Sequence, residues 1–202
     1  MAAEAAALLV SDGMSVGLGT GSTVAHLLPA LAARGLRLRC VATSVATERA
    51  ARDLGLAIEE FDRLDRLDIA IDGADQVDPD RWLVKGGGGA HTREKIVAVA
   101  ADRFVVIADS SKPTERIAAP IPLELSRFGV TATLRELGGA ELREAPPSPD
   151  GGLIADYTGA VADPASLAAR LAMVPGVVEH GLFAPELVAD VLIGRGEEVE
   201  RL

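Results

Sequence analysis

A glycine-rich turn between an apolar strand and a helix is the feature that most constrains the fold of this chain. Residues 17–24 read Gly-Leu-Gly-Thr-Gly-Ser-Thr-Val, after the apolar run 14–16 and before the helical run 25–28. Strand, glycine turn and helix in this order begin a βαβ unit. Because apolar strands alternate with helical patterns up to about residue 109, we predict an α/β fold with an open, mostly parallel, Rossmann-like sheet.

The turn itself is suited to an anion. Ser22 and Thr23 stand at the predicted helix start, where hydroxyls cap backbone N–H groups and bind phosphate oxygens. A dinucleotide fingerprint would need its third glycine at Ser22 and an acidic residue ending the next strand at Val41, and it has neither. A Walker loop would need Gly-Lys-Ser or Gly-Lys-Thr, which is absent. A tight βα turn without a ligand is the alternative interpretation.

A second glycine loop follows Lys85. Residues 86–89 are four consecutive glycines, and residues 90–97 read as a helix. Glycines let a ligand approach backbone N–H groups, and the helix start adds the positive end of its dipole. Glu94, in the first turns of that helix, is a carboxylate held beside this anion site. A glycine hairpin followed by a helix with a dipole-favourable Glu explains the same residues without catalysis.

A third cluster, residues 72–78, follows the apolar strand 67–71. Asp72 and Asp75 are therefore expected at the carboxyl end of a buried parallel strand, where open α/β sheets bind ligands. Two such carboxylates can move protons or hold a divalent metal. The stretch lacks the glycine and the Glu that an EF-hand loop requires at its sixth and twelfth positions. A plain turn explains Asp78-Pro79-Asp80 better than it explains Asp72.

The charge composition limits which kinds of ligand and partner the protein can bind. The formal net charge of −10 disfavours nucleic acid and repels any phosphate ligand at long range. An anion site in this chain therefore needs positive charge close to it. The only three lysines, Lys85, Lys95 and Lys112, lie in or beside the motifs. The histidines have no metal-ligand spacing, so we expect no metal; His26 and His180 read as structural residues, and His91 is assigned no catalytic role.

The sequence also indicates a compartment. No apolar run approaches the ~18 residues of a membrane span. The alanine-rich start carries Glu4 rather than a basic region, which argues against a signal peptide. We therefore expect a cytoplasmic protein without a membrane partner. The single cysteine, Cys40, lies in the predicted buried strand 36–41 and reads as an inert core thiol.

The pattern changes after three prolines, Pro113, Pro120 and Pro122. Strand and helix signals then follow the order βαββαβ, which predicts a small ferredoxin-like α+β domain. We predict a Rossmann-like catalytic domain over residues 1–120, with 188–202 as a candidate addition to it, and the ferredoxin-like domain over 121–187. The acidic run 197–200 is expected to be a solvated end.

Taken together, these motifs resemble those of type A ribose-5-phosphate isomerase. The resemblance rests on Gly-Thr-Gly-Ser-Thr at 19–23, Asp-Gly-Ala-Asp at 72–75, Lys-Gly-Gly-Gly at 85–88 and Thr-Arg-Glu-Lys at 92–95, with Ala-Asp-Ser-Ser-Lys at 108–112. Their order and spacing match, and the similarity covers nearly the whole chain. The opening helix, 2–10, is short and has no Lys or Arg, whereas family members can direct a basic residue from it towards the phosphate. Phosphate affinity is therefore the property in which a difference is expected.

The resemblance implies isomerisation of ribose 5-phosphate and ribulose 5-phosphate without metal or organic cofactor. It assigns catalysis to Glu94, Asp72 and Lys85. The substrate-binding residues that it implies are Thr20, Gly21, Ser22, Thr23, Asp72, Gly73, Ala74, Asp75, Lys85, Gly86, Gly87, Gly88 and Lys112. A homodimer or homotetramer is expected, with apolar surface around Val177, Val178, Leu182 and Phe183.

Two alternatives stand beside this prediction. A sugar-phosphate sensor would come with a DNA-binding helix-turn-helix, and only about a dozen residues precede the first predicted strand. A sensor also has no need for Glu94 beside Lys85. A sugar-phosphate deaminase or lactonase is the nearer alternative, but the motif spacing favours the isomerase.

Overall fold

The computed structural model describes residues 1–202. The chain divides into two compact units. The first comprises Met1–Ala74, Arg93–Lys112 and Glu186–Leu202, and the second comprises Asp75–Thr92 and Pro113–Pro185. No helix in either unit has the length and apolar character that crossing a membrane requires.

A six-stranded sheet forms the centre of the first unit. Its strands are β1 (Ser15–Leu18), β2 (Arg39–Ala42), β3 (Ile69–Gly73), β6 (Phe104–Asp109), β12 (Val188–Arg195) and β13 (Glu198–Arg201). They lie in the order β13-β12-β6-β3-β1-β2. All neighbours from β12 to β2 pair in parallel, and β13 pairs antiparallel with β12. The predicted open, mostly parallel sheet is confirmed.

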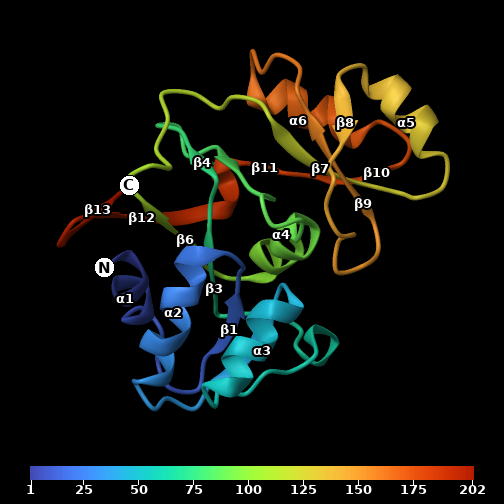
Figure 1. Cartoon of the computed structure of the whole chain (residues 1–202). Helices are drawn as coiled ribbons and strands as arrows, with labels where there is room; N and C mark the ends of the chain where they lie inside the picture. Colours follow the sequence, from blue (N-terminus) through green and yellow to red (C-terminus); the bar gives the residue numbers. More distant parts are fainter. The chain divides into compact units, whose positions relative to one another are not determined.

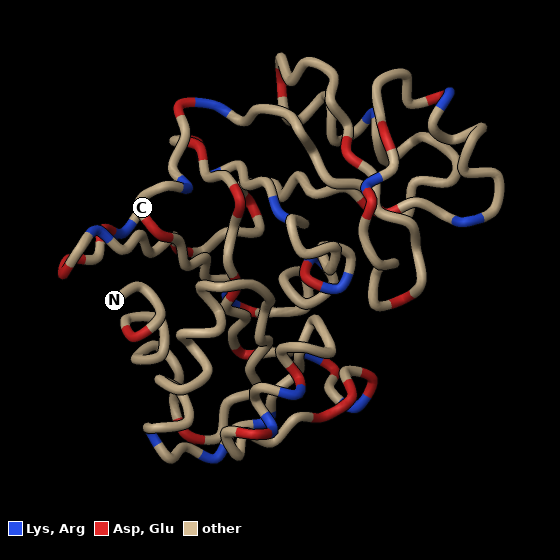
Figure 2. Tube along the Cα trace, in the orientation of Figure 1, with Lys and Arg blue, Asp and Glu red and all other residues tan.

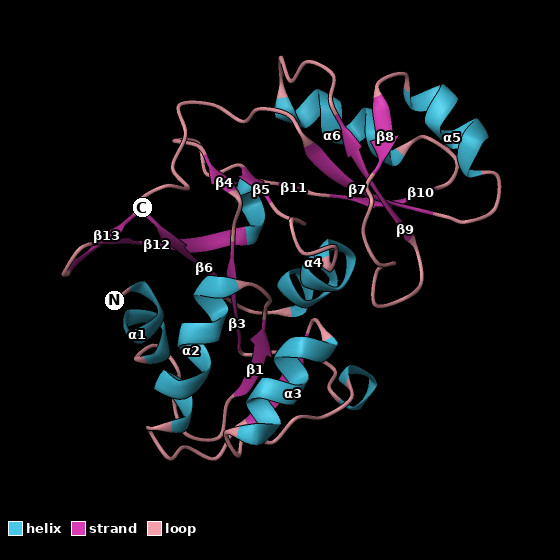
Figure 3. Cartoon of the chain, viewed as in Figure 1, coloured by secondary structure: helices cyan, strands magenta, loops and turns pink.

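Helices cover both faces of this sheet, and helices and strands alternate over residues 2–73 (Figure 3). Helices α1 (Ala2–Ala7) and α2 (Ser22–Ala32) lie side by side (Figure 1) and share one core with β1, β3 and β6, to which α3 (Val45–Asp53) adds Ala51. Val16 and Leu18 of β1 point into that core. Gly17, between them, faces the opposite side, where helix α4 (His91–Ala100) packs.

The absence of a side chain at Gly17 determines how closely α4 approaches. A Cβ atom there would lie 2.4 Å from Val97 Cγ1, which is closer than packed carbon atoms allow. Val97 stands three residues after Glu94, so the two side chains share a face of α4. The contact between Gly17 and Val97 therefore holds the Glu94 face of the helix towards the sheet.

The sheet has a topological switch point between β1 and β3. From β1 the chain runs through α2 to β2 on one side, and it returns to β3 on the other side. The loops that leave β1 and β3 therefore diverge at the carboxyl edge of the sheet. Such a divergence opens a crevice, and ligands of open α/β sheets bind there.

The second unit contains the predicted βαββαβ order. Its elements are β7 (Ile121–Leu125), α5 (Val130–Leu137), β8 (Ala140–Leu142), β9 (Leu153–Tyr157), α6 (Pro164–Ala172) and β10 (Val177–His180). The strands form an antiparallel sheet in the order β10-β7-β9-β8. Leu167 and Leu171 of α6 are buried in the same core as Leu123 and Ala155 of the sheet. The expected ferredoxin-like α+β arrangement is confirmed.

A three-stranded sheet in the second unit was not predicted from the sequence. Strands β4 (Gln76–Val77), β5 (Leu83–Val84) and β11 (Leu182–Phe183) pair antiparallel. Strands of two residues are too short for a period of two to be visible. The sheet places 75–92 in the second unit, so the compact units differ from the domain boundary at residue 120, which stays a prediction.

One expectation for a surface segment was wrong. Leu182 and Phe183 are 1% and 0% exposed, so they form no open apolar surface, because pairing with β5 takes them into the interior. The glutamates of the acidic end are exposed, as expected, but the edge strand β13 that this end forms beside β12 was not predicted. Arg195 Nε donates to Glu200 Oε2 at 2.6 Å and Arg201 Nε donates to Asp190 Oδ1 at 2.6 Å, so ion pairs link the two strands.

Cys40 behaves as expected for a core thiol. It is fully buried in β2 and has no disulfide partner. Burial raises its thiol pKa to about 12, so the reactive thiolate is scarce at neutral pH.

Candidate functional site

The Asp72 carboxylate lies at the switch point, held by the backbone. Thr20 N–H donates to Asp72 Oδ1 at 3.0 Å, and Gly73 N–H donates to the same oxygen at 2.7 Å. A Cβ atom on Gly19 would lie 1.9 Å from Asp72 Cγ, so only glycine fits beside it. Asp72 is 3% exposed. Its carboxylate therefore has a fixed orientation at the end of β3.

Threonines from the next βα unit support this loop, and the sequence did not reveal them. Thr43 Oγ1 lies 2.9 Å from Thr20 Oγ1, and Thr47 Oγ1 donates to the carbonyl oxygen of Gly19 at 2.8 Å. Both threonines are buried. They lie more than 20 residues from the loop in sequence, and only the parallel pairing of β1 with β2 brings them beside it.

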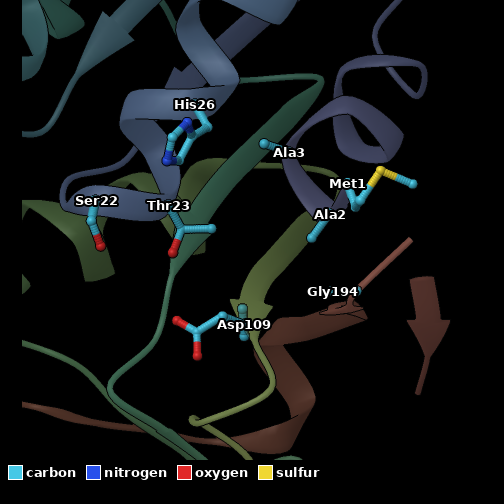
Figure 4. Close-up of a pocket in the computed structure, with 10 residues that line it drawn as sticks. Met1, Ala2, Ala3, Ser22, Thr23, His26, Asp109 and Gly194 are labelled. Carbon is cyan, nitrogen blue, oxygen red and sulfur yellow. The ribbon is translucent and has the colours of Figure 1, made fainter. Parts of the chain in front are cut away.

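A cavity of about 290 Å³ opens at the start of α2. Ser22, Thr23, His26 and Asp109 contribute polar side chains to its lining, together with residues 1–3. Figure 4 shows the Ser22 and Thr23 hydroxyls and the Asp109 carboxylate facing the same space. The sequence had suggested that these hydroxyls cap the helix. Gly21 occupies the N-cap instead, at φ 107°, and no side chain caps the helix start.

The positive end of α2 therefore faces this cavity. The first N–H groups of a helix have no partner within the helix, and together with the helix dipole they favour an anion. Ser22 and Thr23 can add hydroxyl donors. His26 lies one turn further along α2 and also lines the cavity.

Asp109 and Lys112 place opposite charges at the end of β6. The side-chain hydroxyl and backbone N–H of Ser111 donate to Asp109, and Lys112 lies nearby. These hydrogen bonds, with the Lys112 charge, hold the pKa of Asp109 below its usual range. The Asp109 carboxylate is thus ionised at neutral pH. A phosphate in the cavity would depend on the helix end and Lys112 to offset that negative charge.

Glu94 lies in the first turns of α4, as predicted, and is 5% exposed. Burial of a carboxylate is costly unless the site uses it or pairs it. The sequence predicted a carboxylate near the glycine loop, but it did not predict that the side chain would be almost completely buried.

Lys85 directly follows β5 and is also buried, at 3% exposure. Its backbone N–H donates to the Gly181 carbonyl oxygen at 2.8 Å, and its Nζ lies 5.5 Å from the centre of the Phe183 ring. A cation over an aromatic face is favourable when both are desolvated. The backbone partner of Lys85 therefore directly precedes β11, and its aromatic partner lies in β11.

The glycine loop binds a carboxylate of the chain itself. Gly87 N–H donates to Asp75 Oδ2 at 2.8 Å, and a Cβ atom on Gly87 would lie only 3.0 Å from Asp75 Oδ1. The sequence had assigned the N–H groups of this loop to a bound anion. At Gly87 that N–H group orients Asp75 instead, which no spacing rule could have shown.

Of the predicted residues, the first unit brings together Thr20 with Asp72, and Ser22 and Thr23 with the Asp109 end of β6. The second unit brings together Asp75 with the glycine loop and Lys85 with Phe183. Gly73 and Ala74 follow Asp72 in the first unit. Asp78 accepts from Trp82 N–H at 2.9 Å in the turn between β4 and β5, which supports its interpretation as a turn residue.

Comparison with known proteins agrees with these motifs. The family model of ribose 5-phosphate isomerase A (phosphoriboisomerase A) matches residues 39–198. The chain is 45% identical to a ribose-5-phosphate isomerase A of Caulobacter sp. (strain K31), over 98% of this chain and 94% of that protein. It is 48% identical to the Halobacterium salinarum protein of the same name, over 86% of this chain and 81% of that one.

Solved structures show the same similarity. Ribose 5-phosphate isomerase A from Methanocaldococcus jannaschii has a TM-score of 0.94 at 35% identity, with 100% of this chain and 96% of that chain covered. A D-ribose-5-phosphate isomerase in complex with phospho-erythronic acid has a TM-score of 0.93 at 34% identity, with 100% and 95% covered. The chain belongs to the ribose-5-phosphate isomerase A family.

Proposed function

We propose that this protein interconverts D-ribose 5-phosphate and D-ribulose 5-phosphate, the aldose-ketose isomerisation for which its family is named. The observation that carries the proposal is the meeting of three motif loops at the carboxyl edge of one parallel sheet. Loops 19–23, 72–74 and 109–112 leave the neighbouring strands β1, β3 and β6. A sugar phosphate at this edge would meet hydroxyls, a carboxylate and the start of α2.

Glu94 is the base in the proposed reaction. It takes the proton from C2 of the open-chain aldose, the C–H electron pair forms the C1=C2 bond, and the carbonyl electrons move to O1. The C2 hydroxyl proton then moves to O1. Glu94 returns its proton to C1 as the C2 carbonyl forms, so the reaction needs no oxidant, reductant, metal or organic cofactor.

The other residues bind the substrate and stabilise the enediolate. Lys85 supplies positive charge for the developing oxyanion, which is effective in a site that excludes water. Asp72 assists ring opening and proton movement among the sugar oxygens, because its fixed carboxylate can meet a hydroxyl without reorganisation. Asp75, oriented by Gly87 N–H, binds sugar hydroxyls.

The phosphate is assigned to the cavity at the start of α2. Ser22, Thr23 and Lys112 are its proposed contacts, and Thr20, Gly21, Gly73, Ala74, Gly86 and Gly88 complete the proposed substrate-binding residues. The helix end and the two hydroxyls support this placement, because a phosphate can accept hydrogen bonds from all of them. His26 is an additional polar group in the same lining.

An activity assay with and without chelator tests this function directly. Purified protein should convert ribose 5-phosphate to a ketose, and exhaustive EDTA treatment should leave the rate unchanged, since the mechanism assigns no step to a metal. Absence of ketose formation would contradict the isomerase. Activity lost in EDTA and restored by one divalent ion would contradict the metal-free mechanism alone.

We also place the enzyme in the cytoplasm, in the non-oxidative branch of the pentose phosphate pathway, without nucleic-acid partners. In Figure 2 acidic and basic residues are interspersed along both units rather than gathered in one basic stripe. The net charge of −10 supports the same view, because binding to nucleic acid is driven by clustered positive charge.

Self-association into a homodimer or homotetramer is a further expectation. Phe128, Met173 and Val178 in the second unit are 93%, 81% and 52% exposed. A contact between subunits would cover such side chains. Light scattering over a dilution series should give a mass of at least twice 20.9 kDa. A mass near 20.9 kDa at every micromolar concentration would contradict the expectation.

A further inference from the structure

Arg143 joins the glycine loop to the sheet of the second unit. It follows β8, and its Nη1 donates to the carbonyl oxygens of Gly86 and Gly87 at 3.1 and 2.9 Å. Its Nε and Nη2 donate to the two carboxylate oxygens of Asp156, on β9, at 2.9 and 2.6 Å. The two side chains are each 23% exposed. One guanidinium therefore binds a carboxylate on one side and two consecutive backbone carbonyls on another.

The contact with Gly86 fixes one peptide plane at both ends. The carbonyl of Gly86 and the N–H of Gly87 belong to the same planar peptide unit and point in opposite directions. Arg143 and the Gly89 N–H, the latter at 3.0 Å, both hold the oxygen, and Asp75 accepts from the Gly87 N–H at 2.8 Å. Rotation of this plane would break these hydrogen bonds together. The orientation of Asp75, a proposed sugar-binding residue, thus depends on Arg143 together with the turn that Gly89 closes.

The contact between Arg143 and Gly87 fixes the next peptide plane, which joins Gly87 to Gly88. Because Arg143 holds the Gly87 carbonyl oxygen, the N–H of Gly88 must point away from the guanidinium. Gly87 and Gly88 are both exposed. Glycine has access to both signs of φ, so the peptide plane between Gly87 and Gly88 could otherwise turn at little steric cost.

Only an arginine can make this set of contacts. The planar guanidinium offers five N–H donors in fixed directions, whereas a lysine ammonium is a point charge on a flexible chain. The hydrogen bonds to Asp156, with the nearby charge of Asp75, raise the pKa of Arg143 above its usual range. The guanidinium therefore stays charged between two carboxylates.

We propose that Arg143, anchored by Asp156, is a positioning residue that sets the directions of the Gly87 and Gly88 N–H groups and thereby orients Asp75 for the sugar. This inference rests on the proposed isomerase function. It assigns no substrate contact to Arg143 itself. Replacement of Arg143 should therefore lower turnover without a matching loss of stability.

The test compares Arg143→Ala, Arg143→Lys and Asp156→Asn with the wild type. A misplacement of about 1 Å can cost on the order of 10²-fold in rate, so kcat for Arg143→Ala should fall by about 10- to 100-fold. Guanidinium ion at sub-denaturing concentration should restore part of that kcat. Arg143→Lys should recover little of it, and Asp156→Asn should show a smaller loss of the same kind. Arg135→Met, an exposed arginine of α5, is the matched control and should keep the wild-type kcat and KM.

Amide NMR supplies a readout that does not depend on activity. The Gly87 and Gly88 amide signals should move in Arg143→Ala and stay in place in Arg135→Met. Unchanged glycine signals, or wild-type kcat and KM in a folded Arg143→Ala, would overturn the proposal. So would a loss of kcat that follows the loss of Tm and resists guanidinium. If Arg143→Ala does not fold, wild-type kinetics in both Arg143→Lys and Asp156→Asn would overturn it. A wild-type protein without isomerase activity would remove the proposed function, while the amide signals would still decide whether Arg143 holds the loop.

Discussion

Replacement of Glu94 by glutamine should abolish most turnover while leaving substrate affinity nearly unchanged. Glutamine keeps the side-chain volume and a hydrogen-bonding oxygen, but it cannot accept the C2 proton. Loss of a general base costs roughly 10²- to 10⁴-fold in rate. The measurement is kcat for Glu94→Gln, alongside calorimetric affinity for a ribose 5-phosphate analogue. Lower kcat at unchanged affinity identifies an interaction made in the transition state.

Glu136→Gln is a suitable control, because Glu136 is an exposed glutamate of helix α5. It should keep wild-type kinetics. If Glu94 served only to favour its helix terminus, Glu94→Gln would cost about 0.3 to 1 kcal/mol of stability with turnover nearly intact. Near-wild-type kcat in that variant would remove Glu94 from the mechanism and leave Asp72 as the next candidate base.

Substitution of Gly19 by alanine should produce the second large loss. The added Cβ would lie 1.9 Å from both Cγ and Oδ1 of Asp72, so the carboxylate or the strand must move. Asp72 cannot retreat easily, since Thr20 and Gly73 N–H groups hold its Oδ1. Displacement of a positioned catalytic group should lower kcat/KM by about 10²-fold. Overpacking should also cost about 1 to 3 kcal/mol of stability.

A double-mutant cycle separates the two effects. In Gly19→Ala/Asp72→Gly the carboxylate and the Asp72 Cβ, which lies 2.5 Å from the added atom, are both gone, so thermal stability should return towards that of Asp72→Gly. Activity should not return, because the carboxylate is missing. Equal stability losses from Gly19→Ala in the presence and absence of Asp72 would show that the clash lies elsewhere. Wild-type kcat/KM in Gly19→Ala would contradict a catalytic role for the observed Asp72 geometry.

Much of the fold could be predicted because its signals are local. A glycine turn after an apolar strand predicted β1 and α2, and the apolar run before Asp72 predicted β3. The order of strands and helices after residue 120 predicted the ferredoxin-like sheet, since each element is long enough to show its period. The glutamates of the acidic run 197–200 are exposed, as their charge suggested, but the pairing of this run with β12 was not predicted. The two-residue strands around Lys85 left no periodic signal.

For the site, the sequence by itself determined which chemical groups are present and at which strand ends and helix starts they stand. Asp72, Ser22, Glu94 and Lys85 follow from residue type and position in a βα pattern. Only the tertiary structure decided what holds them. Thr47 reaches the loop after β1 through strand pairing, and Arg143 reaches the glycine loop from a hairpin more than 50 residues away. The physical reason is that a local pattern specifies the backbone of one segment, whereas the direction of a buried polar group depends on hydrogen-bond partners that folding brings from distant segments.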